Sequence, residues 1–447
     1  MSGKECFEIL DKIFLPKKME NIENIKGYTM KYGHIVENLK EYDGFEVPES
    51  AIVDEVLVSY FKEPMSYTTE NMCEINTHGG NIVVKKILEL CLKNGAEMAE
   101  PGEFTKRAFL NGRIDLLQAE SVIDIIDAKS ERELKAGMNQ LEGRVSKEIH
   151  DIKQKIMDVM VNVEVDIDYP EYDVEEVTNT EINEMLDVVI ADLSRLEKSF
   201  DNGKILKDGV KTAIIGKPNA GKSSLLNCIL NEERAIVTEI EGTTRDTIEE
   251  FVTVEGVPLK LIDTAGIREA KDEVEKIGIT KSKEIAKDAD LIIAIFDSSK
   301  DLTDEDKEIL DIIKNKTAIV VLNKMDLLNK IDENMAEIKN VSKYIVKMST
   351  LEQKGIADLY KSIGNLFSME EISLDNTTVI TNVRHKNLIS KALNSCREAK
   401  KSMELGMPLD IIAIFLKEIL ENLGEITGET VTDDIIDEIF SKFCLGK

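Results

Sequence analysis

The stretch "IIGKPNAGKSS", residues 214–224, decides the fold of the central part of the chain. Gly216 is followed by four residues and then by Gly221, Lys222 and Ser223, between an apolar run and a helical pattern. This is the phosphate-binding loop in the context that it requires. The glycines let backbone N–H groups close on phosphates, and the helix N-terminus adds a positive dipole end. The predicted contacts are Asn219, Ala220, Gly221, Lys222, Ser223 and Ser224, with Lys222 on the β- and γ-phosphates and Ser223 on Mg²⁺.

The residues around this loop predict a doubly wound, mostly parallel sheet. Short apolar runs, "TAIIG", "LKLIDT", "LIIAIFD" and "TAIVVLN", alternate with helical segments between residues 206 and 367. Alternation of this kind is typical of an α/β domain with a parallel sheet.

Three later motifs indicate that the nucleotide is GTP. In "LIDTAG", Asp263 ends an apolar strand and can hold the Mg²⁺ shell, and the loop continues with Thr264, Ala265 and Gly266. In "NKMD", which supplies Asn323, Lys324 and Asp326, a carboxylate can accept hydrogen bonds from N1–H and the exocyclic amine of guanine. Ser349 and Thr350 of "MST" would lie behind the guanine base. Adenine offers neither donor in that arrangement.

One expected catalytic group is absent from its usual place. Many GTPases carry a glutamine after the glycine of "DTAG" to orient the attacking water, whereas Ile267 stands there. An apolar side chain cannot do this work, and no arginine finger is identifiable from spacing.

The rest of the chain predicts a multidomain α/β plus α protein. "AIVDEVLVSYF" and "MCEINTHGGNIVV" read as strand-rich, and "IVVKKILELCLKNG" as an amphipathic helix that ends at Gly95. Helical periodicity dominates from about Leu116 to Leu196 and returns from about Asn382. The predicted domains are residues 1–112, a helical domain in two parts at 113–205 and 370–447, and an inserted G domain at 206–369.

Composition excludes several classes of protein. The net charge is −29, which argues against a broad nucleic-acid-binding face. Six scattered cysteines without a CxxC pair argue for reduced thiols in a cytoplasm, not for a zinc site or a disulfide framework. No apolar run reaches about 18 residues, and the first residues lack the apolar stretch of a signal peptide. We therefore expect a cytoplasmic protein with no membrane span.

The C-terminal "SKFCLGK", residues 441–447, permits three interpretations. Gly446 and Lys447 fit a prenylation box badly. A frayed tail with a chance cysteine is the ordinary alternative. The third is a thiol, that of Cys444, placed at a site.

At this point the chain closely resembles the tRNA-modification GTPase family MnmE, also called TrmE, over nearly its whole length. The resemblance rests on "GKPNAGKSSLLN", "AIVTEIEGTTRDTIEE", "DTAGIREAKDEVEKIGI", "PGEFTKRAFLNGRIDLLQAESVIDIIDA" and the terminal "FCLGK". The last two discriminate most, because many families share the GTPase motifs.

The resemblance implies how the missing catalytic groups are replaced. A bound K⁺ would stand in for the arginine finger, held by Asn219 and by a loop with Thr238, Ile240 and Thr243. That loop, from Thr238 through Glu239, Ile240, Glu241, Gly242 and Thr243 to Thr244, would contact GTP, with Thr244 as the second Mg²⁺ ligand. Glu275 would orient the attacking water through a second water.

The family also implies the chemistry and the partners. The N-terminal domain would bind a formyl- or methylene-tetrahydrofolate through Glu74, Arg113 and Lys447, and form a homodimer. Cys444 would then be delivered to the folate by an active-site tail. With the flavoprotein MnmG (GidA), the family adds an aminomethyl-type group to C5 of the wobble uridine of certain tRNAs.

One departure and two alternatives remain at this point. In the family a strand and a glycine-rich turn ending in arginine precede the segment resembling "SGKECFEIL", so about twenty residues, a sheet strand and one folate contact are expected to be lacking. The first alternative is a ribosome-associated or regulatory switch GTPase without covalent tRNA chemistry. The second is a structural dimeric scaffold with a degenerate G domain, which the intact motifs disfavour.

Overall fold

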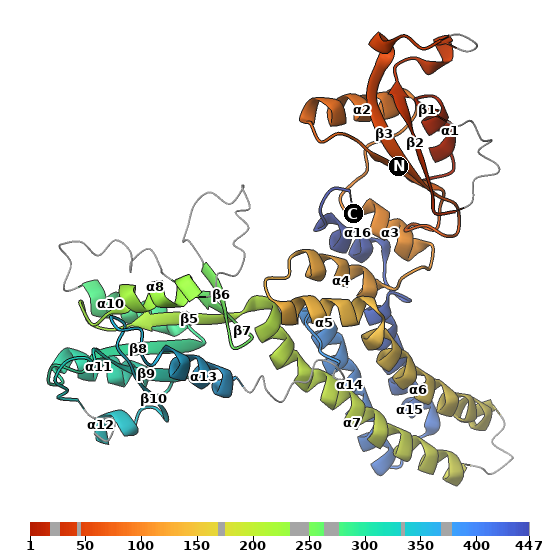
Figure 1. Cartoon of the computed structure of the whole chain (residues 1–447). Helices are drawn as coiled ribbons and strands as arrows, with labels where there is room; N and C mark the ends of the chain where they lie inside the picture. The colour runs from red at the N-terminus through yellow and green to blue at the C-terminus, as the bar shows by residue number, and fades with distance from the viewer. Residues whose placement is uncertain are drawn as a thin grey trace. The chain divides into compact units, whose positions relative to one another are not determined.

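The computed structural model describes residues 1–17, 27–42, 46–168, 175–232, 250–262, 277–331, 336–367 and 378–446 (Figure 1). The chain forms two compact units. The first comprises Met1–Ile123 with Gly424–Lys447, and the second comprises Asp124–Leu423. Within the described residues, no helix is both long and apolar enough to cross a membrane.

The first unit contains an antiparallel four-stranded sheet in the order β1-β2-β3-β4. Val56, Val58 and Tyr60 of β3 alternate with more exposed residues and are buried with α1 and α2. The elements are α1 (Cys6–Asp11), β1 (Phe14–Pro16), β2 (Thr29–Val36), η2 (Leu39–Tyr42), η3 (Glu49–Ala51), β3 (Ile52–Phe61), β4 (Met72–Asn76) and α2 (Asn81–Lys93).

The predicted strand character of "MCEINTHGGNIVV" is wrong in its second half. Strand β4 ends at Asn76, and α2 begins at Asn81 after Gly79 and Gly80. The glycines break the strand, and the apolar residues that follow form the first turn of the predicted amphipathic helix.

The rest of the first unit joins chain segments that are distant in sequence. Helices α3 (Glu103–Leu110), α4 (Leu116–Ile126) and α16 (Asp433–Ser441) share a core that includes Ala108, Leu116, Phe440 and Phe443. The C-terminal tail is held on this core: the Gly102 N–H donates to the Cys444 carbonyl at 3.3 Å, and Leu445 forms an antiparallel bridge with Pro101. Up to Gly446, the frayed-tail interpretation is therefore wrong.

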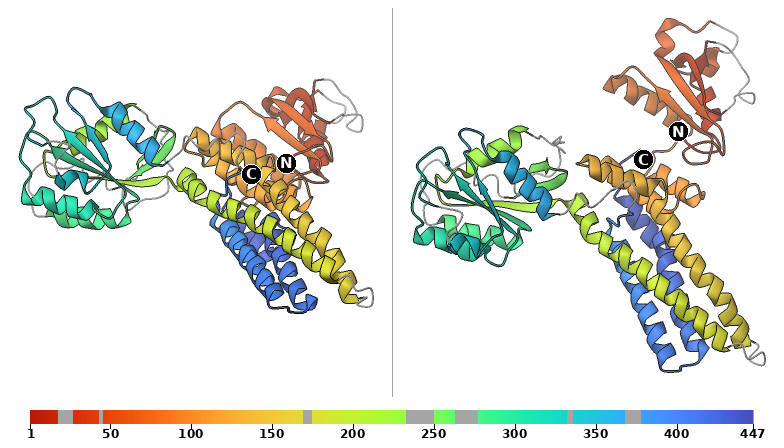
Figure 2. Two further views of the ribbon diagram at one scale, coloured as in Figure 1. Left: turned by 90° about the horizontal axis from the view of Figure 1, so that it is seen from below. Right: turned by 60° about the horizontal axis from the view of Figure 1, so that its bottom comes forward.

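The second unit contains long helices that pack lengthwise. Helix α7 lies beside both α6 and α14 (Figure 2). Helix α6 buries Ile149, Ile152, Ile156 and Val163 at helical spacing, which makes one face of this helix apolar. The helices of this part are α5 (Glu131–Leu141), α6 (Arg144–Asp168), α7 (Glu175–Asp208), α14 (Val383–Glu404) and α15 (Leu409–Thr427), the last of which continues from Gly424 into the first unit.

The second unit also contains a six-stranded sheet in the order β10-β9-β8-β5-β7-β6. Among the described strands only β6 is antiparallel to its neighbour, so the sheet is mostly parallel, as predicted. The strands are β5 (Val210–Ile215), β6 (Glu250–Val254), β7 (Val257–Leu261), β8 (Leu291–Asp297), β9 (Ala318–Asn323) and β10 (Tyr344–Lys347). The helices are α8 (Lys222–Glu232), α10 (Ile277–Asp288), α11 (Asp304–Ile313), α12 (Ala336–Lys339) and α13 (Ile356–Leu366).

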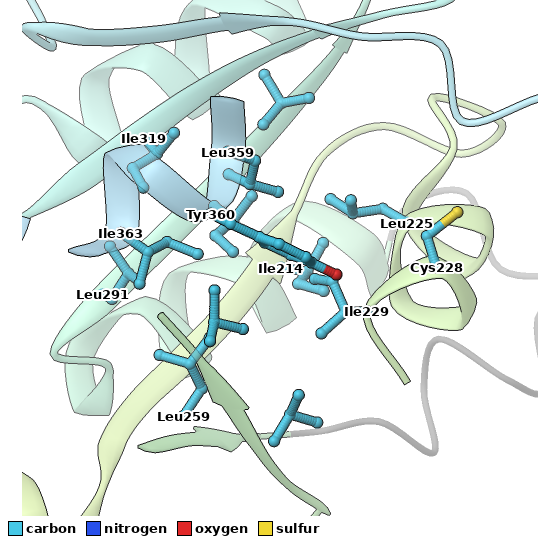
Figure 3. Packing of buried hydrophobic residues seen from close by; sticks show 14 of the residues in the cluster. Ile214, Leu225, Cys228, Ile229, Leu259, Leu291, Ile319, Leu359, Tyr360 and Ile363 are labelled. Atoms are coloured by element: carbon cyan, nitrogen blue, oxygen red, sulfur yellow. The ribbon is translucent and has the colours of Figure 1, made fainter. Parts of the chain in front are cut away.

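Two apolar cores cover the two faces of this sheet, which explains the uninterrupted apolar strands. Ile293 and Ile295 of β8 face the core with α8 and α13, whereas Ile292 and Phe296 face the core with α10 and α11. Figure 3 shows the first core, with the ring of Tyr360 among its aliphatic side chains. The predicted fold class, multidomain α/β plus α, is confirmed; the predicted domain boundaries stay a prediction.

Gly102 offers a test of how the tail is held. Gly102 has φ +69°, and a Cβ there would lie 2.9 Å from Phe443 side-chain atoms. Gly112 has φ +72° and nothing within 4 Å of such a Cβ, so it is a matched control. Gly112→Ala should cost about 1 kcal/mol for left-handed backbone, and Gly102→Ala about 1–3 kcal/mol more for overpacking.

Differential scanning fluorimetry should therefore give a lower unfolding midpoint for Gly102→Ala than for Gly112→Ala. Equal midpoints for the two variants would show that the docked tail does not restrict this position.

Candidate functional site

The loop between β5 and α8 encloses the ammonium group of its own lysine. Lys222 Nζ donates to the carbonyl oxygens of Gly216 and Lys217 at 2.7 and 2.8 Å. Burial lowers the pKa of Lys222 below its ordinary value. Because α8 begins at Lys222, the first N–H groups of the helix face the end where a phosphate would bind.

Packing alone requires a glycine at both positions of the motif. A Cβ at Gly216 would lie 2.4 Å from the Ile295 carbonyl oxygen, and a Cβ at Gly221 would lie 2.1 Å from Asn323 Nδ2. Asn219 is exposed and has φ +61°, a backbone region that few residues other than glycine adopt. The loop is therefore pressed against β8 and the end of β9.

Asn323 of "NKMD" connects its own motif with the phosphate loop and with "MST". Its buried side chain donates from Nδ2 to the Ala220 carbonyl oxygen at 2.9 Å and to Thr350 Oγ1 at 3.2 Å. Its Oδ1 accepts from the Thr350 N–H at 3.0 Å. Ser349 Oγ in turn donates to Asp326 Oδ1 at 2.5 Å, and Asp326 stays exposed. Within the described part of the chain, the phosphate loop is thus brought together with "NKMD" and "MST", which are predicted to surround the base.

A second lysine of the loop, missed from the sequence, anchors it to α11. Lys217 Nζ lies 2.6 Å from Asp306 Oδ2 and donates to Thr303 Oγ1 at 2.8 Å. Asp306 is buried and also accepts from the Thr303 N–H in a capping box. The signal was the sequence "TDED", a capping-box pattern, but nothing in it says which loop Asp306 would contact. Asp297, which ends β8, was missed in the same way.

Several predicted site residues lie outside the described part of the chain. They are Thr238, Glu239, Ile240, Glu241, Gly242, Thr243, Thr244, Asp263, Thr264, Ala265, Gly266, Glu275 and Lys447. Of the predicted Mg²⁺ and K⁺ ligands, the structure therefore describes Ser223 and Asn219.

The predicted folate residues lie apart from the nucleotide loop in sequence and belong to the first unit. Glu74 is exposed on β4, opposite Ser59 of β3. The Arg113 guanidinium lies over the Tyr67 ring, 4.4 Å from its centroid, and lines an open pocket of about 390 Å³ with Asp115. Among the described residues, no hydrogen bond or ion pair joins Glu74, Arg113 and Cys444.

A larger cavity of about 830 Å³ in the first unit holds none of the predicted site residues. It is lined by Met1–Cys6 and by the ion-paired Arg107, which contacts Glu70 at 3.1 Å and Glu103 at 2.5 Å. Size alone does not make it the functional site, since the Arg107 guanidinium in its lining is already paired with Glu70 and Glu103.

Comparison with known proteins agrees with the motifs along the whole chain. A family model described as MnmE helical domain matches residues 116–444, and one described as GTP-binding protein TrmE N-terminus matches residues 1–113. A tRNA modification GTPase MnmE of Thermoanaerobacter pseudethanolicus is 50% identical over 100% of this chain and 95% of its own. The chain belongs to the MnmE (TrmE) family of tRNA modification GTPases.

Further relatives carry the same name. The MnmE of Clostridioides difficile is 48% identical and that of Finegoldia magna is 46% identical, each over 100% of this chain and 95% of the relative. A solved structure of the G domain of the FeoB iron transporter of T. maritima is 26% identical over 35% of this chain and 98% of its own, with a TM-score of 0.27. Family membership confirms the predicted family and the prediction of a GTP hydrolase. It disfavours both alternatives, the regulatory switch GTPase and the structural scaffold.

The base contact gives the first functional prediction. Asp326→Asn should weaken GTP binding by about tenfold to a hundredfold, since an amide offers an N–H₂ group where guanine also donates. The same variant should bind xanthosine triphosphate more tightly than the wild type does, because xanthine carries a carbonyl in place of the exocyclic amine. Titration of both nucleotides measures the preference; an unchanged preference would mean that Asp326 does not contact the base.

Proposed function

We propose that this chain is a potassium-activated GTPase that works with an MnmG (GidA)-type flavoprotein. Together they add an aminomethyl-type group to C5 of the wobble uridine of certain tRNAs, with a tetrahydrofolate derivative as one-carbon donor. The observation that supports the proposal is that Asn323 of "NKMD" bonds to Ala220 of the phosphate loop and to Thr350 of "MST", in a chain that relatives named MnmE match over its full length.

The nucleotide half of the proposal assigns a role to each loop. Lys222 and the first N–H groups of α8 would bind the phosphates, and Ser223 with Thr244 would hold Mg²⁺. From the sequence, Asp263, Thr264, Ala265 and Gly266 would meet the γ-phosphate, and Glu275 would orient the attacking water.

The residues present fit a potassium ion in place of an arginine finger. Asn219 is exposed at a left-handed turn, and its amide oxygen is a hard donor of the kind that suits a monovalent cation. Thr238, Ile240 and Thr243 would complete the donor set. The ion would supply positive charge beside the β–γ bridge, where negative charge develops in the transition state.

The folate half rests on the first unit. Glu74 is exposed and can accept hydrogen bonds from the amino and N–H groups of a pterin, while Arg113 and Lys447 offer positive charge to a folate carboxylate. A 5-formyl- or methylene-tetrahydrofolate would supply the one-carbon unit. Cys444 is exposed, and the Gly102 N–H holds its backbone through the Cys444 carbonyl, so the tail that carries the thiol is docked on this unit.

The charge of the chain supports a division of labour with a partner. At −29, the chain would leave much of the tRNA contact to the flavoprotein. A homodimer through the N-terminal domain and a cytoplasmic location complete the proposal.

Potassium dependence is the second functional prediction. GTP turnover should rise by about tenfold or more when K⁺ replaces Na⁺ at equal ionic strength, because the cation would stabilise transition-state charge. Steady-state phosphate release in the two salts measures this effect, and equal rates would refute the potassium site.

Two substitutions test the potassium site and the orientation of the attacking water separately. Asn219→Ala should abolish the difference between K⁺ and Na⁺. Glu275→Ala should slow hydrolysis by about a hundredfold and leave GTP affinity nearly unchanged, as expected for a residue that acts mainly in the transition state.

The exposed thiol provides a further prediction. Cys444→Ser should leave GTP binding and K⁺-stimulated hydrolysis near normal but abolish tRNA modification in a reconstituted assay with MnmG, GTP and the folate. Mass spectrometry of the wobble nucleoside measures the product.

Alkylation supplies a matched control, because the other five cysteines are buried and Cys444 is exposed. A thiol reagent applied to the folded protein should block modification in the wild type, and it should leave GTP hydrolysis unchanged in both the wild type and Cys444→Ser. Product formed by Cys444→Ser at the wild-type rate would make the tail a docking element without a catalytic thiol.

A further inference from the structure

A buried carboxylate lies behind the loop that is predicted to bind the base. Asp297, the last residue of β8, is 9% exposed, and its Oδ2 accepts from Lys324 Nζ at 2.7 Å. Its Oδ1 accepts from Ser299 N–H and Oγ at 3.1 and 2.6 Å. Both oxygens are thus bonded, and one of them is bonded to a lysine of "NKMD".

Electrostatics support a charged Asp297. Burial by itself raises the pKa of its carboxyl, but the hydrogen bonds from Lys324 and Ser299 outweigh burial and hold the pKa below its ordinary value. A second cation, Lys300, lies 3.9 Å from Oδ2, but its side chain is 71% exposed and solvent screens it. Lys324 is therefore the main charge partner.

The backbone of Lys324 explains why a partner is needed. Lys324 has φ +65°, in the left-handed region that a residue with a side chain rarely adopts. Such a conformation persists only where surrounding contacts enforce it, and residues of this kind gather at functional sites. The hydrogen bond to Asp297 is a contact of the Lys324 side chain that opposes relaxation of this turn.

Ser298, next to Asp297, bonds to both ends of the segment from Asn323 to Lys330. Ser298 donates from its N–H and its Oγ to the Asn323 carbonyl oxygen at 2.9 and 2.6 Å. Its own carbonyl accepts from the Lys330 N–H at 2.8 Å. Asp297 and Ser298 therefore contact this loop at Asn323, Lys324 and Lys330, and Asp326 lies two residues after Lys324.

We propose that Asp297 is a positioning residue for the guanine base. By holding the Lys324 ammonium, it keeps the turn from Asn323 to Asp326 in the geometry that presents the Asp326 carboxylate to the nucleotide. This inference depends on guanine-nucleotide binding alone, and neither potassium nor folate enters it.

The main test compares Asp297 with Asp301, an aspartate in the segment that follows β8. Asp297→Asn removes the negative charge and keeps the shape, and Asp301→Asn does the same to an exposed carboxylate that pairs with Lys330 at 3.0 Å. Titration with a fluorescent GDP analogue should show about tenfold to a hundredfold weaker binding for Asp297→Asn. Asp301→Asn should bind within twofold of the wild type. Binding by Asp297→Asn within twofold of the wild type would overturn the proposal.

A double-mutant cycle tests whether Asp297 acts through Lys324. In a Lys324→Met background, Asp297→Asn should weaken binding by no more than about twofold further, because the contact is already lost. It should also raise the unfolding midpoint of Lys324→Met, since it removes a buried charge left without its partner. An equal loss of affinity in both backgrounds would overturn the proposal and leave Asp297 a packing residue of β8. If Asp297→Asn alone does not fold, the unfolding midpoint still tests the proposal. A double variant whose midpoint is no higher than that of Lys324→Met would overturn it.

Discussion

The nucleotide loops are held together by one buried amide, the side chain of Asn323. It has one acceptor and two donor hydrogens, and the structure uses them on Ala220 of the phosphate loop and on Thr350. A buried amide left without these partners would be costly, so the spacing of the loops is tied to a single side chain. Its Nδ2 also occupies the space where a side chain at residue 221 would begin, and Gly221 is the residue that permits this approach.

The position of the Asn323 side chain depends in turn on the parallel sheet. Asn323 and Asp297 are the final residues of β9 and β8, which are parallel and paired in register at these two positions. The carboxyl ends of parallel strands meet at one edge of a sheet, which is where α/β proteins bind ligands. Because both faces of β8 are buried, by Ile293 on one side and Phe296 on the other, the strand cannot shift without disturbing two cores.

The sequence was sufficient wherever a residue's role follows from its neighbours in the chain. The apolar runs predict the strands of the parallel sheet, and the loop with Gly216 and Gly221 lies between β5 and α8 as predicted. It was insufficient where a role depends on a partner far away in the chain. Lys217 and Asp306 are separated by many residues, and Asp297 with Lys324 likewise, so no local pattern pairs them. The bonding of the tail to Pro101 and Gly102 is another such case, because a chain end without periodicity does not indicate what it contacts.

Two ion pairs stabilise the loops of this site, each at a different end. Lys217 is paired with buried Asp306 near the phosphate end, and Lys324 with buried Asp297 near the base end. Each pair lies close to a non-glycine residue with left-handed backbone. In the first pair this residue is Asn219, which follows Lys217 closely in the chain, and in the second it is Lys324 itself. The charges of both lysines are therefore already balanced by protein carboxylates. Lys222 differs, because among the described residues its ammonium hydrogen-bonds to carbonyl oxygens, and it is the lysine of this loop that we propose for the phosphates of the nucleotide.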